Sequence, residues 1–147
     1  DTTAGMLARF QTMVVDLKPS HVIIFGGTND ISLGLKNNVI LSNIVAMVKL
    51  ALYHNIKPII GVPTSCFESK NLKLRNSKLY LSSKKMIKRV QKFQEIIKEF
   101  AIDRELEYID FSKNLTSSDY IEDKIHPNNN GHVKMMINVK DLLKNSI

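Results

Sequence analysis

The chain has 147 residues, of which 44% are apolar, and it carries a formal net charge of +7. This length is typical of a single domain with its own core, and no apolar run reaches the roughly 18 residues that a membrane-spanning helix needs. The single cysteine, Cys66, excludes an internal disulfide and fits a reducing compartment, so we expect a cytoplasmic protein without stable membrane insertion.

Residues 1–63 predict two helices, each followed by a buried strand. The first helix covers residues 4–17, and its apolar positions lie on one stripe: Met6, Leu7, Phe10, Met13, Val14 and Leu17. The run HVIIFGG at 21–27 is typical of a buried parallel strand that ends in a tight turn. The second helix covers 38–56, with apolar positions at Leu41, Ile44, Val45, Val48 and Leu52. KPIIGVP at 57–63 predicts the second strand.

A basic stretch follows, with nine lysines and arginines and no acidic residue between 70 and 92. It lacks the aromatic side chains interleaved on a sheet that nucleic-acid readers use. A solvated helix face explains it better than a nucleic-acid or anionic lipid surface, so we expect no nucleic-acid partner.

The remaining segments predict a helix, a strand and a final helix. The helix covers roughly residues 80–103, with its stripe at Met86, Val90, Phe93, Ile97 and Phe100. LEYIDF at 106–111 predicts the third strand, and the last helix runs from about 129 to 145. Strands alternating with helices predict one α/β domain over 1–147, a three-layer α/β/α sandwich with a parallel sheet. Because three strands make a narrow sheet, we expect the domain to begin with a strand before residue 1.

GGTND at residues 26–30 follows the first predicted strand. In open parallel sheets, binding sites form at the carboxyl ends of the strands. Glycine lets a ligand approach the backbone, which makes Gly27 and Thr28 candidates for substrate binding, and the Asn29 amide can donate to a developing oxyanion. An ordinary strand-to-helix turn explains the same residues, since Gly, Asn and Asp are common in turns.

DKIHP at 123–127 precedes the last helix. The separation of three residues lets the Asp123 carboxylate reach Nδ1 of His126, which leaves Nε2 free to accept a proton. A helix N-terminus with an exposed histidine is the alternative explanation.

Together the two motifs resemble those of the SGNH hydrolases, also called GDSL-type esterases and lipases. GGTNDI is similar to that family's third block and DKIHPNNNG to its fifth, while DTTAGMLARF looks like the helix after its second block. The resemblance implies a flavodoxin-like fold and serine ester hydrolysis of a small-molecule substrate without a cofactor. It assigns Asn29 to the oxyanion hole, and Asp123 and His126 to the triad.

The family's nucleophile lies in a Gly-Asp-Ser block on its first strand, beside the strand that corresponds to 21–27. The resemblance therefore places the nucleophilic serine before residue 1, and we expect the 147-residue chain alone to be inactive. Without that strand, the exposed sheet edge would favour association with another copy, a homo-oligomer.

Other nucleophiles and ligands have weaker support in the sequence. Ser65 and Cys66 have no neighbours that indicate activation, and His21, His54 and His132 are expected to be structural or exposed. No spacing indicates a metal site. Two alternatives stay open: a non-catalytic fragment or binding domain that keeps the fold, and, less well supported, a flavodoxin-like ligand-binding or receiver domain.

Overall fold

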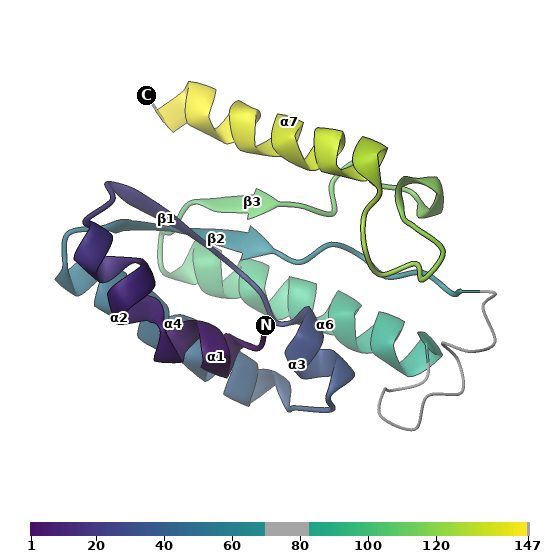
Figure 1. Ribbon diagram of the computed structural model, residues 1–147, viewed down its shortest axis with the longest axis horizontal. Helices are drawn as coiled ribbons and strands as arrows, with labels where there is room; N and C mark the ends of the chain where they lie inside the picture. Colours follow the sequence, from purple (N-terminus) through teal and green to yellow (C-terminus); the bar gives the residue numbers. More distant parts are fainter. Residues whose placement is uncertain (70–82, 147) are drawn as a thin grey trace.

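The computed structural model describes residues 1–69 and 83–146 (Figure 1). The elements in chain order are α1 (Thr3–Ala8), α2 (Phe10–Met13), η1 (Val15–Leu17), β1 (His21–Phe25), α3 (Thr28–Ser32), α4 (Asn37–Tyr53), β2 (Lys57–Val62), α6 (Ser83–Asp103), β3 (Tyr108–Asp110), η2 (Ser117–Asp119) and α7 (Asn129–Ser146). The three strands pair in the order β1-β2-β3, and both pairs are parallel, as the alternation of elements predicts.

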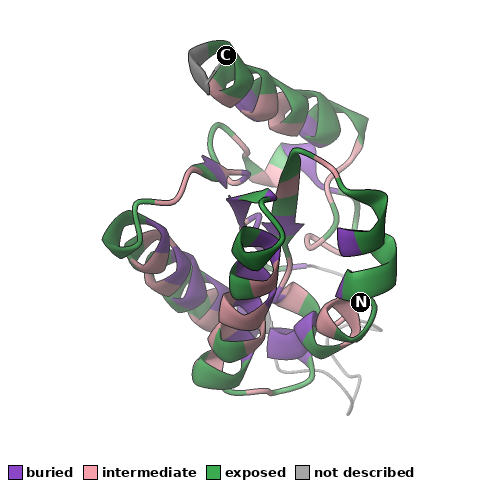
Figure 2. Cartoon of the chain, turned by 90° about the vertical axis from the view of Figure 1, so that its left-hand side faces the viewer, coloured by how far each residue is buried: buried purple, intermediate pink, exposed green. Residues whose placement is uncertain are grey.

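Helices lie on both sides of this sheet, which confirms the predicted three-layer architecture. Figure 1 shows α1, α2, α4 and α6 on one side and α7 on the other, over β3. The larger core lies on the side of α1, α2, α4 and α6 and includes Phe10, Ile24, Ile40, Met47, Ile60, Val90, Phe93 and Ile97. The smaller core lies under α7, where Met135, Val139 and Leu142 pack against Ile59, Ile109 and Phe111. Figure 2 shows buried positions on the helix faces turned toward the interior and exposed positions on the outer faces.

The first predicted helix is wrong in its second half. The chain forms α1, a short α2 and the 3₁₀ turn η1 instead of one continuous helix. Met13 and Leu17, predicted to face the core, are 60% and 72% exposed. The sequence Thr-Met-Val-Val at 12–15 is rich in β-branched residues, which lose side-chain freedom in a helix, and the left-handed Lys18 ends the segment.

The other predicted elements are present with small shifts. In α4 the buried stripe is rotated from the predicted one, because Ile40, Met47 and Ala51 are buried whereas Leu52 is 53% exposed. The predicted start of α6 at residue 80, and the basic residues of 70–82, lie outside the described residues. Further along α6, the lysines of the basic stretch are exposed, as expected for a solvated helix face. None of the described helices is long and apolar enough to cross a membrane.

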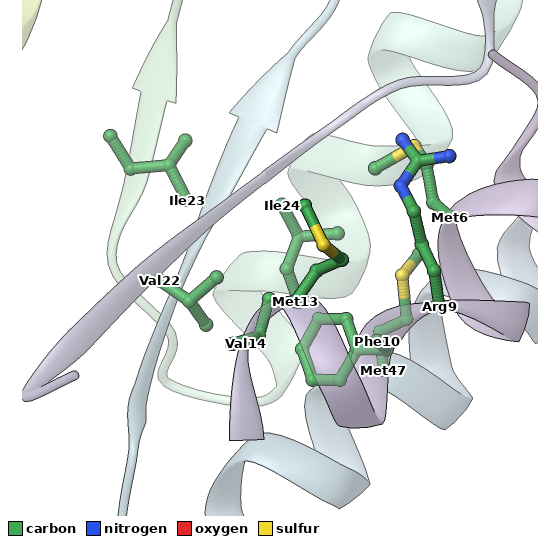
Figure 3. Close-up of a pocket in the computed structure, with 9 residues that line it drawn as sticks. All are labelled: Met6, Arg9, Phe10, Met13, Val14, Val22, Ile23, Ile24 and Met47. Atoms are coloured by element: carbon green, nitrogen blue, oxygen red, sulfur yellow. The ribbon is translucent and has the colours of Figure 1, made fainter. Parts of the chain in front are cut away.

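Strand β1 is an edge strand, since among the described residues it pairs only with β2. Its side chains alternate: Val22 and Ile24 face the helical side, where Figure 3 shows them beside Phe10, and Ile23 points to the opposite side of the strand. Ile23 and Phe25 are 40% and 38% exposed. An edge strand with exposed apolar side chains is a surface on which another strand can pair.

Candidate functional site

The loop before α7 brings Asp123 and His126 into direct contact. Nδ1 of His126 lies 2.6 Å from Oδ2 of Asp123. The Asp123 side chain is 18% exposed, whereas that of His126 is 70% exposed. When the carboxylate holds the proton of Nδ1, the unprotonated Nε2 of a neutral ring is left as the proton acceptor. The hydrogen bond predicted from the spacing of the two residues is therefore present.

Local hydrogen bonds build this loop. Oδ1 of Asp123 accepts the backbone N–H groups of Ile125 at 2.8 Å and of His126 at 2.9 Å. Lys124, between them, adopts a left-handed conformation with φ 60°. An aspartate that accepts from the backbone just ahead of it is typical of Asx-turns. One carboxylate oxygen thus fixes the turn while the other contacts the imidazole.

The loop is anchored to the start of α7. Tyr120 and Pro127 form an antiparallel bridge, and the backbone N–H of Asn128 donates to the carbonyl oxygen of Asp119 at 2.8 Å. Gly131, in the first turn of α7, lies against the same carbonyl, because a Cβ atom there would be only 2.4 Å from the oxygen of Asp119. A glycine is required at this close approach.

The pKa of Asp123 lies below its usual value. Burial of the carboxyl raises the pKa, but the hydrogen bonds from the His126 backbone and ring and from the Ile125 backbone, together with the interaction with the imidazole charge, lower it by more. Asp123 is consequently an anion at neutral pH and can stabilise a positively charged imidazolium.

Asn29 lies on the short helix α3, which begins directly after the turn at Gly27. Gly27 has φ 109°, and a Cβ atom there would lie 2.6 Å from the Phe93 ring, so the position needs glycine on both counts. At the other end of α3 the Arg89 guanidinium donates to the carbonyl oxygens of Ile31 and Leu35. Cationic donors are favourable at the carboxyl end of a helix. Helix α6, which carries Phe93 and Arg89, therefore fixes the position of α3.

The Asn29 side chain is exposed, and its Nδ2 donates to the carbonyl oxygen of Asp1 at 2.9 Å. An amide nitrogen carries two hydrogens, so this bond still leaves one donor for a ligand.

A pocket of about 440 Å³ joins the two motifs. Gly27, Thr28 and Asn29 line it from the end of β1, and His126 lines it from the loop before α7. The site is thus at the carboxyl edge of the parallel sheet, as expected for this architecture. Its volume lies within the range of roughly 300–1,000 Å³ that is usual for small-molecule sites.

Several lining residues were not predicted from the sequence, among them three polar residues from separate parts of the chain. Thr64 follows β2, Arg9 lies between α1 and α2, and His132 is in the second turn of α7. His132 could have been predicted, because it lies six residues after His126, near the start of the helix that follows the Asp–His turn. Arg9 and Thr64 lack such a signal, since only the packing of distant elements brings them here.

The alternative nucleophiles have surroundings that oppose activation. Burial, and secondarily the negative charge of Asp123, raise the pKa of Cys66 to about 11, so the thiol is protonated at neutral pH. The Ser65 hydroxyl accepts a hydrogen bond from the Gln94 amide at 3.3 Å. Neither Ser65 nor Cys66 lines the pocket. His21 and His54 are exposed and also lie outside it. Within the described residues, no group of three or more His, Cys, Asp or Glu side chains could hold a metal ion.

A His–Asp pair and an asparagine amide at one pocket are groups that can accept a proton and donate to an oxyanion, respectively. Residues 1–134 match the model of the GDSL-like Lipase/Acylhydrolase family, and the chain belongs to this family. The resemblance to SGNH hydrolases is therefore confirmed. No match was found among curated proteins.

Solved structures of this family have the same fold. A GDSL-like lipase from Bacteroides thetaiotaomicron VPI-5482 is 20% identical with a TM-score of 0.80, and the match covers 100% of this chain and 73% of that one. A member of the lipolytic protein G-D-S-L family from Veillonella parvula DSM 2008 is 21% identical with a TM-score of 0.76, covering 98% and 75%. The acetylxylan esterase Axe2 from Geobacillus stearothermophilus, solved as a catalytic mutant, is 17% identical with a TM-score of 0.73, covering 95% and 66%.

Proposed function

We propose that the chain supplies the acid–base and oxyanion-binding half of a serine ester hydrolase. His126 is the general base, Asp123 orients it, and Asn29 stabilises the oxyanion. The observation that carries this proposal is the 2.6 Å contact between His126 Nδ1 and Asp123 Oδ2, at a pocket that Asn29 also lines. Gly27 and Thr28, in the same wall, contact the bound small-molecule ester.

The chemistry follows from these positions. His126 Nε2 removes the proton of a serine hydroxyl as its oxygen attacks the ester carbonyl, and Asn29 donates to the oxygen that becomes negative. The imidazolium, stabilised by the anionic Asp123, then gives the proton to the leaving alcohol. Water attacks the acyl-enzyme in the same way, which releases the acid and restores the serine. These steps need no cofactor.

The nucleophilic serine is proposed to lie before residue 1. Two observations on the described part of the chain support this placement: the residues that line the pocket include no serine, and β1 pairs on one edge only, which leaves its other edge open beside the pocket. A preceding strand paired with β1 would end at the same carboxyl edge of the sheet. In Axe2, two catalytic mutants carry alanine in place of a serine and of a histidine, respectively.

The test is covalent labelling with a fluorophosphonate probe, followed by intact mass and peptide mapping. The protein with its upstream segment should form one adduct on a serine before residue 1, and His126→Ala should abolish it. His54→Ala is the matched control, because His54 is exposed and distant from the pocket, and it should label like the wild type. The 147-residue chain should form no adduct and should not turn over p-nitrophenyl acetate.

An adduct on Ser65, or on any serine within these residues, that depends on His126 would show that the nucleophile is misplaced. Full-length protein that does not label and does not hydrolyse esters would instead support the non-catalytic alternative.

A further inference from the structure

The side chain of Asp30, next to Asn29 in α3, is completely buried. Its carboxylate accepts three hydrogen bonds from Thr3: the backbone N–H lies 2.9 Å from Oδ2 and 3.2 Å from Oδ1, and the hydroxyl lies 2.6 Å from Oδ1. Among the described residues, no lysine, arginine or histidine forms an ion pair with it. Burying a carboxylate without a cation is costly, and hydrogen bonds offset that cost only in part.

Thr3 connects this carboxylate to two other helices. It is the first residue of α1 and is itself completely buried. Its hydroxyl has one hydrogen, which it donates to Asp30, and it accepts a hydrogen bond from Nδ2 of Asn43 in α4 at 3.0 Å. The hydrogen-bonded chain from the half-buried Asn43 through Thr3 to Asp30 therefore ties together α4, the start of α1 and α3.

The same segment also holds the amide of Asn29. The carbonyl oxygen of Asp1, two residues before Thr3, accepts from Asn29 Nδ2, and both Asp1 and Asn29 line the pocket that contains His126. Successive residues on a helix point about 100° apart, so Asp30 faces the interior while Asn29 faces the pocket. Residues 1–3 and 29–30 are thus joined by two sets of hydrogen bonds, one between Thr3 and Asp30 and one between Asp1 and the amide of Asn29, the proposed oxyanion donor.

We propose that Asp30 is a positioning residue that acts through Thr3: it fixes the start of α1, whose preceding residues orient the Asn29 amide toward the oxyanion. This inference rests on the proposed function, because it concerns the same oxyanion hole. It explains why a carboxylate is kept in a position that is completely buried.

A pair of substitutions at Thr3 tests the proposal in the full-length protein. Thr3→Val keeps the shape and the backbone N–H but removes the hydroxyl that donates to Asp30, whereas Thr3→Ser keeps the hydroxyl. Thr3→Val and Asp30→Asn should lower kcat by about 10- to 100-fold, because a small misplacement of a catalytic group has effects of this size. KM should change by less than about twofold, since the oxyanion exists only near the transition state. Thr3→Ser should retain kcat.

Asp110→Asn is the matched control. The Asp110 carboxylate also accepts a backbone N–H and a hydroxyl, at 2.9 and 2.6 Å, both from Ser112. Unlike Asp30 it also pairs with Lys98, at 2.6 Å, and it does not line the pocket. This variant should lower the melting temperature and leave kcat unchanged. A second readout is independent of catalysis: the ¹⁵N–¹H signals of the Asn29 side chain should shift in Thr3→Val and stay in place in Thr3→Ser and Asp110→Asn.

The outcomes separate the two proposals. Activity that survives His126→Ala overturns the proposed function. If His126→Ala is inactive but folded Thr3→Val keeps the wild-type kcat, with or without a shift of the Asn29 signals, only the positioning role is overturned. Should Asp30→Asn fail to fold, the comparison of Thr3→Val with Thr3→Ser still decides.

Discussion

The two walls of the pocket are held in place by different kinds of interaction. In the loop before α7, the hydrogen bonds of the Asp123 carboxylate join partners that are two and three residues apart in the sequence. The α3 wall depends on distant partners: Asp30 bonds Thr3, 27 residues away, and Arg89 bonds the carbonyl of Ile31, 58 residues away. Local hydrogen bonds close the Asp123–His126 turn, and the backbone N–H of Phe67 ties it to the rest of the fold by donating to the carbonyl oxygen of Lys124 at 2.9 Å. Within the described residues, the α3 wall has no such local hydrogen bonds to its buried carboxylate and depends on the packed core.

This difference separates the expected effects of mutation. A change in the loop removes one chemical group and leaves the core intact, so it should affect activity more than stability. A change under α3 disturbs contacts between α1, α4 and α6, so it should affect both. These effects are expected in the protein with its upstream segment.

Asp123→Asn should lower kcat by about 10⁴-fold, because an amide at this position can donate to Nδ1 and favours the wrong tautomer of the His126 ring. The melting temperature should change little, since an asparagine oxygen can still accept the N–H groups of the turn. Steady-state kinetics and calorimetry measure the two effects. Glu122→Gln, at the exposed neighbouring acid, should keep the wild-type kcat. An Asp123→Asn variant with activity within tenfold of the wild type would remove Asp123 from the triad.

Asn29→Ala should lower kcat by roughly 10²–10³-fold with little change in KM, as for the loss of one oxyanion donor. The exposed Asn130 in α7 supplies the control Asn130→Ala, which should behave like the wild type. A rise in KM at unchanged kcat would mean that Asn29 holds the substrate in its ground state instead.

The local and distant contacts also explain what could be predicted from the sequence. The Asp123–His126 bond follows from a separation of three residues in a turn, and the three strands follow from short β-branched runs. The buried bond between Asp30 and Thr3 was not predicted, because Asp30 reads as an ordinary turn residue until α1 is packed beside it. The same reason applies to Arg9 and Thr64 in the pocket, and the break of the first helix was missed because its apolar stripe looked continuous.

Gly27→Ala should destabilise the fold by about 2–3 kcal/mol for two reasons. The alanine would have to adopt a left-handed backbone conformation, and its methyl group would overlap the Phe93 ring. Gly34→Ala separates the two causes. Gly34 also has a positive φ, 86°, but a Cβ atom there would have no neighbour within 4 Å. The free energy of unfolding of Gly34→Ala should fall by only about 1 kcal/mol, from backbone strain alone. Denaturant unfolding measures both variants, and equal losses would show that the Phe93 contact relaxes without cost.

Asp119 tests the loop side through pH. Hydrogen bonds from Lys134 and Thr116, together with the charge of Lys134, outweigh partial burial and lower the pKa of this carboxyl from 3.8 to about 2. A group whose pKa is depressed on folding contributes stability above its unfolded pKa, and this contribution is lost as the pH falls through the folded pKa. At neutral pH the wild type should therefore have a higher melting temperature than Asp119→Asn. The difference between the two melting temperatures should narrow as the pH falls from 3.8 toward about 2. Asp103→Asn, at the exposed end of α6, is the control for the loss of one negative charge. If the difference for Asp119→Asn stays constant down to pH 2, the Lys134 and Thr116 contacts contribute through shape alone. The start of α7 would then be held by Gly131 and the backbone of the loop.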